Sequence, residues 1–78
     1  MTSRIIVDQD ILLGKPIIKG SRITVEFVIG LLAQGWKYED ITKNYPRVTQ
    51  EDIIACLKYA SEVLESEKVF PIPSSKVA

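Results

Sequence analysis

The dipeptide Tyr45-Pro46 is the feature that most constrains how this chain folds, because it separates two helical patterns by one short turn. A residue that precedes proline disfavours the helical region, so the first pattern must end at or before Tyr45. Thr49 then offers a side chain that caps the start of another helix. Two helices joined by so short a connection are typical of a helix-turn-helix arrangement.

A further helix is predicted ahead of this pair. Thr24 is a favourable N-cap, Glu26 places negative charge in the first turn, and Gly35 suits the position just after a helix end. These signals predict a helix over residues 25–34. Its apolar side chains cover most of its circumference, which predicts burial on more than one side or at a dimer interface. They are Val25, Phe27, Val28, Ile29, Leu31, Leu32 and Ala33.

The two helices that flank Tyr45-Pro46 show different apolar patterns. Tyr38, Ile41 and Tyr45 form a narrow apolar stripe at i, i+3 and i+7, which predicts a helix over residues 38–44. The next helix starts after Thr49, and Asp52 three residues later resembles a shortened capping box. We predict that its inward seam consists of Ile53, Leu57, Ala60 and Leu64, widened by Ile54, beside a second apolar stripe of Cys56, Tyr59 and Val63.

The chain before Thr24 contains short runs of β-branched and apolar residues between turn residues. Residues 4–7, 11–13 and 17–18 predict two or three very short strands. Gly20-Ser21 then forms either the tip of a hairpin or a bend. The predicted fold is therefore mainly α with a small N-terminal β element: a three-helix, helix-turn-helix-like domain over residues 1–66, followed by an extended arm over residues 67–78.

Size and charge bound the range of functions. A single core in a chain of 78 residues contributes only about 3–5 kcal/mol of net stability, so we expect a homodimer or a tightly bound partner. Ten basic and ten acidic side chains give no net charge, which removes the strongly basic surface of many nucleic-acid-binding proteins. The first 23 residues are the more basic end, with four basic and two acidic side chains.

Location is predicted from the one cysteine and from the apolar segments. A single cysteine cannot form a disulfide within the chain and fits a reducing compartment, so we expect a cytoplasmic protein. The longest mostly apolar segment is about half as long as a membrane-spanning helix requires, and no export signal opens the sequence. We therefore expect no membrane partner.

Catalysis is not predicted. The chain contains no histidine, which excludes the Ser-His-Asp and Cys-His nucleophile arrangements and any metal site built on histidine. Asp8 and Asp10 are more typical of a turn than of a metal site, and Cys56 among apolar neighbours is more typical of an inert packed thiol. We expect no catalytic residue, metal, cofactor or small-molecule substrate, and therefore no enzyme.

DNA is one candidate partner. The helix after Thr49 would present its first turn to a DNA groove, but Glu51 and Asp52 in that turn repel phosphate. The basic residues nearer the N-terminus are better candidates for phosphate contacts, although scattered surface lysines are equally common. The candidate DNA-contacting residues are Lys15, Lys19, Arg22, Lys43, Arg47, Thr49 and Gln50.

Protein is the other candidate partner. Two prolines at alternate positions of the C-terminal arm favour an extended conformation, which suits addition to the edge of a partner's sheet or binding in its groove. The alternatives are an arm that packs on its own domain and one that is disordered. Trp36 is either an exposed anchor or a side chain that folds back beyond a helix end. The candidate partner-binding residues are Val69, Phe70, Pro71, Ile72 and Pro73.

The spacing of the glycines, prolines and aromatic residues resembles that of the prokaryotic family known as domain of unknown function 433. The resemblance covers residues 14–64 and rests on a G-x-P-x-I-x-G-S-R-I stretch at a fixed distance from Tyr45-Pro46. The residues that carry it are Gly14, Pro16, Ile18, Gly20, Ser21, Arg22, Ile23, Gly35, Ile41, Tyr45, Pro46, Leu57, Tyr59 and Ala60. The chain departs from the pattern at Ser21 and Lys37, where threonine and a capping Ser or Thr are usual.

This resemblance implies a helix-turn-helix-like fold and a role as the antitoxin of a type II toxin–antitoxin pair. The implied partner is a PIN-like nuclease toxin, which the antitoxin binds and neutralises, with promoter DNA as a further ligand. Two alternatives stay open: a DNA-binding regulator that acts alone, and a dimerisation or adaptor module.

Overall fold

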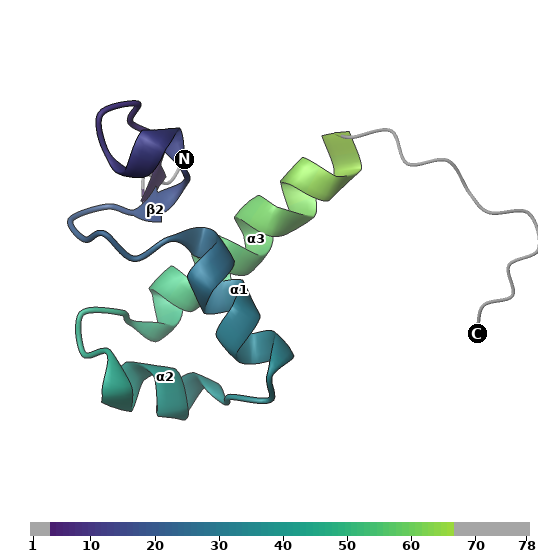
Figure 1. Cartoon of the computed structure of the whole chain (residues 1–78). Helices are drawn as coiled ribbons and strands as arrows, with labels where there is room; N and C mark the ends of the chain where they lie inside the picture. The colour runs from purple at the N-terminus through teal and green to yellow at the C-terminus, as the bar shows by residue number, and fades with distance from the viewer. Residues whose placement is uncertain (1–3, 67–78) are drawn as a thin grey trace, which may run out of the picture.

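Three helices and a small antiparallel sheet make up the fold (Figure 1). The structure is a computed structural model and describes residues 4–66. In chain order the elements are β1 (Ile5–Ile6), the short 3-10 turn η1 (Leu12–Gly14), β2 (Ile17–Ile18), α1 (Val25–Ala33), α2 (Tyr38–Asn44) and α3 (Gln50–Ser66). The mainly helical fold with a small N-terminal β element is confirmed. The predicted arm over residues 67–78 lies outside the described residues.

Helix α1 is terminated at both ends by the residues that the sequence indicates. The Thr24 hydroxyl oxygen accepts a hydrogen bond of 3.0 Å from the backbone N–H of Phe27. At the other end Gly35 has a φ of +97°, and the N–H of Trp36 donates to the carbonyl of Leu31 at 3.1 Å. This Schellman arrangement satisfies carbonyls of the last turn. It also turns Trp36 back against the core, where the side chain is partly buried.

Helix α2 begins at Tyr38 although the preceding Lys37 is a poor capping residue. The carboxylate of Asp40 compensates, because it accepts a hydrogen bond of 2.8 Å from the Lys37 backbone N–H. The helix ends at Asn44, and Tyr45 and Pro46 begin the turn to α3. The ring of Tyr45 lies edge-on against Phe27 of α1, with ring centroids 5.4 Å apart.

The sheet pairs Ile5 with Ile18 and Ile6 with Ile17 in antiparallel register. The optional third strand over residues 11–13 does not form, because Leu12, Leu13 and Gly14 have φ values of +50°, +59° and +82°. Left-handed backbone of this kind ends any extended run and forms a tight turn instead.

Upstream hydrogen bonds explain where this turn falls. The Asp8 carboxylate accepts from the N–H of Asp10 at 2.9 Å, and the Asp8 carbonyl accepts from the N–H of Ile11 at 2.9 Å. Side-chain bonds of this type start turns. The Asp8-Gln9-Asp10 segment therefore forms a turn, and the leucines that follow it, Leu12 and Leu13, are exposed on the surface.

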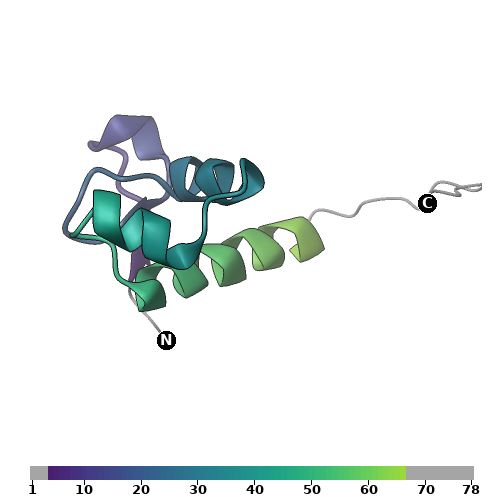
Figure 2. The ribbon, with the colours of Figure 1, turned by 90° about the horizontal axis from the view of Figure 1, so that it is seen from below.

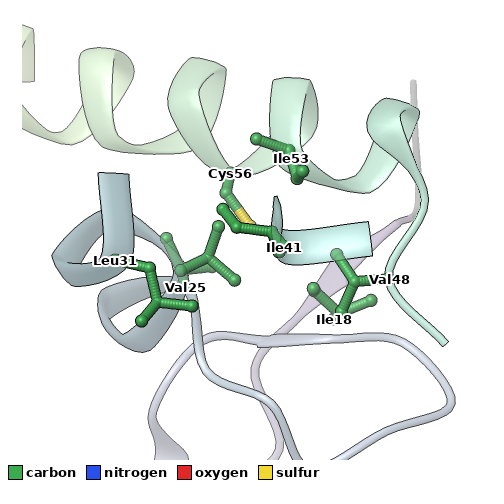
Figure 3. Packing of buried hydrophobic residues seen from close by; sticks show 8 residues of the cluster. Ile18, Val25, Leu31, Ile41, Val48, Ile53 and Cys56 are labelled. Carbon is green, nitrogen blue, oxygen red and sulfur yellow. The ribbon is translucent and has the colours of Figure 1, made fainter. Parts of the chain in front are cut away.

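The core lies where α1, α2 and α3 meet beside β2 (Figure 3). Ile41 of α2 points toward Ile53 and Cys56 of α3, and each of these three side chains is fully buried. The buried hydrophobic residues are Ile17, Ile18, Val25, Val28, Leu31, Ile41, Val48, Ile53 and Cys56. Helix α1 contributes only one of its faces to this cluster, so apolar positions on its other faces stay near the surface.

The predicted seam of α3 is wrong in its rotation about the helix axis. Cys56 is fully buried, whereas Leu57 and Leu64 are 38% and 63% exposed. The helix carries two apolar stripes, and helical spacing alone does not say which one meets the rest of the chain. Contacts with α1 and α2 select the stripe through Ile53 and Cys56, which turns Leu57 outward.

Helix α3 is the longest element and extends beyond the helices that cover it. Figures 1 and 2 both show its C-terminal turns projecting beyond α1. Its 17 residues compare with 9 in α1 and 7 in α2. Neither α3 nor any other helix in residues 4–66 has the combination of length and hydropathy that a membrane-crossing helix needs.

We expect the substitution Ile53→Ala to lower the free energy of unfolding by about 2–5 kcal/mol, because it leaves a cavity among fully buried side chains. The neighbouring Ile54→Ala is a matched control. Ile54 is 41% exposed, so its truncation should cost about 1 kcal/mol or less. Urea unfolding followed by circular dichroism measures both values. Equal losses for the two variants would contradict the rotation of α3 described above.

Candidate functional site

The start of α3 is fixed by a reciprocal capping box. The Thr49 N–H donates to Asp52 Oδ2 at 3.0 Å, and the Asp52 N–H donates to Thr49 Oγ1 at 3.1 Å. The other carboxylate oxygen of Asp52 accepts from Arg4 Nη1, also at 3.0 Å. Asp52 is thus buried with both oxygens bonded, and its carboxylate ties the start of α3 to the residue that precedes β1.

This capping box limits what the first turn of α3 can offer to a DNA groove. Thr49 and Gln50 are exposed there, as a recognition helix requires, but the Thr49 hydroxyl is already bonded to the Asp52 backbone. Glu51 is exposed beside them and adds a negative charge that phosphates repel. The first turn therefore presents one amide side chain, that of Gln50, for base contacts.

A basic edge forms where the loop after β2 meets the turn before α3. Arg47 Nη1 donates to the carbonyl oxygen of Gly20 at 3.0 Å, which joins two segments that are 27 residues apart in sequence. Lys19 and Arg22 flank Gly20, and all three basic side chains are exposed. We call Lys19, Arg22 and Arg47 the basic edge. It brings together three of the residues predicted to contact DNA.

The loop that carries the basic edge is held by hydrogen bonds of its own. Ser21 Oγ donates to the carbonyl of Ile18 at 2.8 Å and accepts from the N–H of Ile23 at 3.0 Å. Gly20 has a φ of +84°, which side chains with a Cβ rarely adopt. Ile17 then pairs with Thr24 across the loop. Gly20-Ser21 is therefore the tip of a tight reversal that holds Lys19 and Arg22 on either side of it.

The other predicted DNA contacts are not part of this edge. Lys15 Nζ lies 3.0 Å from Glu26 Oε2 at the start of α1, so its charge is locally compensated. Lys43 is exposed in the last turn of α2. The predicted partner-binding residues Val69 to Pro73 lie outside the described residues.

An apolar stripe lies on the exposed side of α3. Ile54, Leu57 and Leu64 are 41%, 38% and 63% exposed. Their spacing of three and seven residues places them on one side of the helix. We call these three residues the outer stripe. The sequence shows these apolar residues at helical spacing but does not reveal which stripe of α3 the other helices cover. The predicted inward seam therefore includes residues that face outward in the structure.

Cys56 lies deep in the core rather than on a reactive surface. Burial of the thiol, together with the smaller effect of the nearby negative charge of Asp52, raises its pKa to about 11. A thiol with so high a pKa is almost entirely protonated at neutral pH and is a poor nucleophile. Within residues 4–66, no group of three or more His, Cys, Asp and Glu side chains is placed to hold a metal ion.

Comparison with known proteins gives a family match and a structural match. Residues 5–60 match the sequence model of the family described as "Protein of unknown function (DUF433)". A crystal structure of a DUF433 member protein from Anabaena variabilis superposes with a TM-score of 0.74 at 27% sequence identity. The match covers 80% of this chain and 61% of that chain, so this chain spans less than two thirds of its structural relative. None of the curated proteins is significantly similar to it.

The buried thiol predicts a loss of stability at high pH. The folded state keeps the Cys56 proton up to a pKa of about 11, whereas the unfolded thiol loses it near 9.0. Stability therefore falls as pH rises through that interval. Wild type should lose on the order of 2 kcal/mol more than Cys56→Ala between pH 8 and pH 10.5. Urea unfolding of both proteins at both pH values measures these losses. Subtracting the loss of Cys56→Ala from that of wild type removes the contribution of the groups that titrate in both proteins. Parallel losses in the two proteins would contradict it.

Proposed function

Because the chain belongs to the DUF433 family, we propose that it acts as the antitoxin of a type II toxin–antitoxin pair and neutralises a nuclease toxin by binding it. The description of the family assigns no activity. The role comes from the antitoxin-like character that the sequence resemblance implies. The structural observation that supports it is the outer stripe of α3.

The outer stripe has the physical character of a protein-binding surface. Its three large apolar side chains lie in a row along one helix, and each is more than a third exposed. Burial of apolar surface contributes about 25 cal/mol per Å² removed from water, so a partner that covers this row gains affinity there. The exposed acidic and basic side chains of α3 around it, including Glu51 and Lys58, would form a polar rim.

The C-terminal arm extends this surface in our proposal. Helix α3 ends at Ser66, three residues before the apolar segment Val69–Pro73 begins. A partner that lies along the outer stripe toward Leu64 is therefore close to the point where the arm begins. We propose that the arm contacts the same partner, a PIN-like nuclease, and that the two contacts together block its RNA channel or its acidic metal site. The arm and α3 then form one continuous binding segment.

The experiment is co-expression of this chain with the neighbouring open reading frame, purification through a tag on one partner, and measurement of mass and stoichiometry. We expect a stable complex whose other component is toxic when expressed alone. Ile54→Lys should weaken the complex at least tenfold, because it replaces an apolar contact with a charge that must be desolvated. Isothermal titration measures the affinity.

Glu62→Lys is the matched control, because it places the same lysine on an exposed position of the same helix without removing an apolar side chain. It should change the affinity by no more than about twofold. Loss of binding by both variants would assign the effect to charge rather than to the outer stripe. A chain that elutes without any partner would remove the antitoxin proposal.

Promoter DNA is a second candidate ligand, supported by the basic edge. Arg47 bonds to the carbonyl of Gly20, next to the turn that leads into α3, and the exposed Lys19 and Arg22 lie on either side of Gly20 in the sequence. Basic side chains suit contacts with the phosphate backbone. Such contacts contribute to the affinity for DNA but do not distinguish one base sequence from another. In this proposal the exposed amide of Gln50, at the start of α3, would make the base contact.

Salt dependence tests this second candidate. If the basic edge contacts phosphates, the affinity for the chain's own promoter falls as salt concentration rises. Lys19→Gln and Arg22→Gln should each reduce the slope of log K against log salt by about one. Lys58→Gln, which removes an exposed charge from α3, should leave the slope unchanged. Fluorescence anisotropy over a salt series measures the slopes, and a flat response in the wild-type protein would exclude this candidate.

A further inference from the structure

An apolar groove lies between α1 and the C-terminal half of α3. Its volume is about 470 Å³. Residues Ile29, Gly30 and Ala33 line it from α1, and Ala60, Val63 and Leu64 line it from α3. The groove is distinct from the basic edge and shares only Leu64 with the outer stripe.

The groove exists because α3 continues its buried stripe beyond the helix that covers it. Ala60 and Val63 follow Cys56 at four and seven residues, so all three point toward the same side of the helix. Cys56 is fully buried in the core, whereas Val63 is 38% exposed. Helix α1 has about half as many residues as α3, and Figure 2 shows α3 running past its end. The inward face of α3 is therefore only partly covered within residues 4–66.

The groove also carries almost no uncompensated charge. Among residues 4–66, Glu26 is the only ionised residue that lines it, and Lys15 lies 3.0 Å from that carboxylate. A second surface of the same composition would meet no like-charge repulsion there. The lining includes Gly30, Ala33 and Ala60, and these small residues allow another helix to approach closely.

We propose that the occupant of this groove is a second copy of the chain. In a two-fold dimer the projecting end of α3 from each copy would lie in the groove of the other, with Val63 and Leu64 against Ile29 and Ala33. The groove and the segment that fills it are adjacent on one surface, which is the condition for an isologous, closed interface. Each copy thus supplies a groove that buries the projecting end of its partner's α3, and its own α3 end is buried in the partner's groove.

The size of the domain favours this occupant over a transient partner. A single core in a chain this short stabilises the fold weakly, and a permanent dimer interface adds apolar burial. The antitoxin proposal does not depend on this interface, because Ile54 and Leu57 of the outer stripe lie outside the groove. Failure of one proposal is therefore distinguishable from failure of the other.

Gly30→Lys tests the proposal with little risk to the fold. A Cβ placed on Gly30 meets no atom within 4 Å, and lysine favours helix more than glycine does. The long charged side chain would nevertheless occupy the groove from both copies. Gly30→Ala is the matched control, because it makes the same change in backbone freedom without filling the groove.

Light scattering of the full-length proteins at about 50 μM would decide the outcome. We expect wild type and Gly30→Ala at twice the chain mass of 8.8 kDa and Gly30→Lys at 8.8 kDa, with helical circular dichroism retained. Ile54→Lys, on the outer stripe, should remain a dimer. A wild-type monomer, or a Gly30→Lys dimer, would overturn the proposal.

Two other occupants would give different results. If the chain's own C-terminal segment fills the groove, wild type is a monomer, and Phe70→Asp combined with Ile72→Asp raises the binding of a hydrophobic dye. If a foreign protein fills it, the isolated chain is a monomer that binds the dye without any substitution. Either result would overturn the assignment of the groove to a second copy.

Discussion

The carboxylate of Asp52 is the constraint on which the arrangement of this domain depends. It is the one charged side chain buried within residues 4–66, and it accepts hydrogen bonds from the Thr49 backbone and from Arg4. One oxygen thereby completes the cap of α3, while the other holds the chain segment that enters β1. A buried carboxylate without partners would be costly, so the cap and the ion pair stabilise each other. This anchored first turn fixes where α3 begins and ties it to the segment that enters β1.

A long helix anchored at one end has consequences for binding. The first turns of α3 are packed against α1 and α2 through Ile53 and Cys56, whereas the last turns run past both helices. This leaves two apolar surfaces on α3, the outer stripe and the groove beside α1. A single small core does not bury both faces of such a helix. Proteins of this size commonly bury the remainder against another chain, which is why both proposals for α3 involve a protein partner.

The basic side chains differ in their surroundings, which the zero net charge of the chain does not reveal. The chain has no net charge, yet Arg47 bonds to the carbonyl of Gly20, which lies in sequence between Lys19 and Arg22, while Lys15 is paired with Glu26. The sequence predicted these residues as separate candidates and did not indicate which of them lie together. The bond from Arg47 to the Gly20 carbonyl closes a loop of 27 residues, and no local pattern predicts a contact of that range.

The sequence by itself determined where the helices start and where α1 and α2 end, because these ends depend on local chemistry. The Thr24 and Thr49 caps, Gly35, and the proline after Tyr45 place these ends within a residue of the observed ones. It did not determine the turn at Leu12 and Leu13, whose left-handed backbone follows a segment in which Asp8 accepts hydrogen bonds from the backbone N–H groups of Asp10 and Ile11. Nor did it determine which stripe of α3 is buried. Both stripes satisfy helical spacing. Only the packing of α1 and α2 against Cys56 decided that Leu57 faces outward. The physical reason is that burial is a property of the assembled helices and not of any one of them.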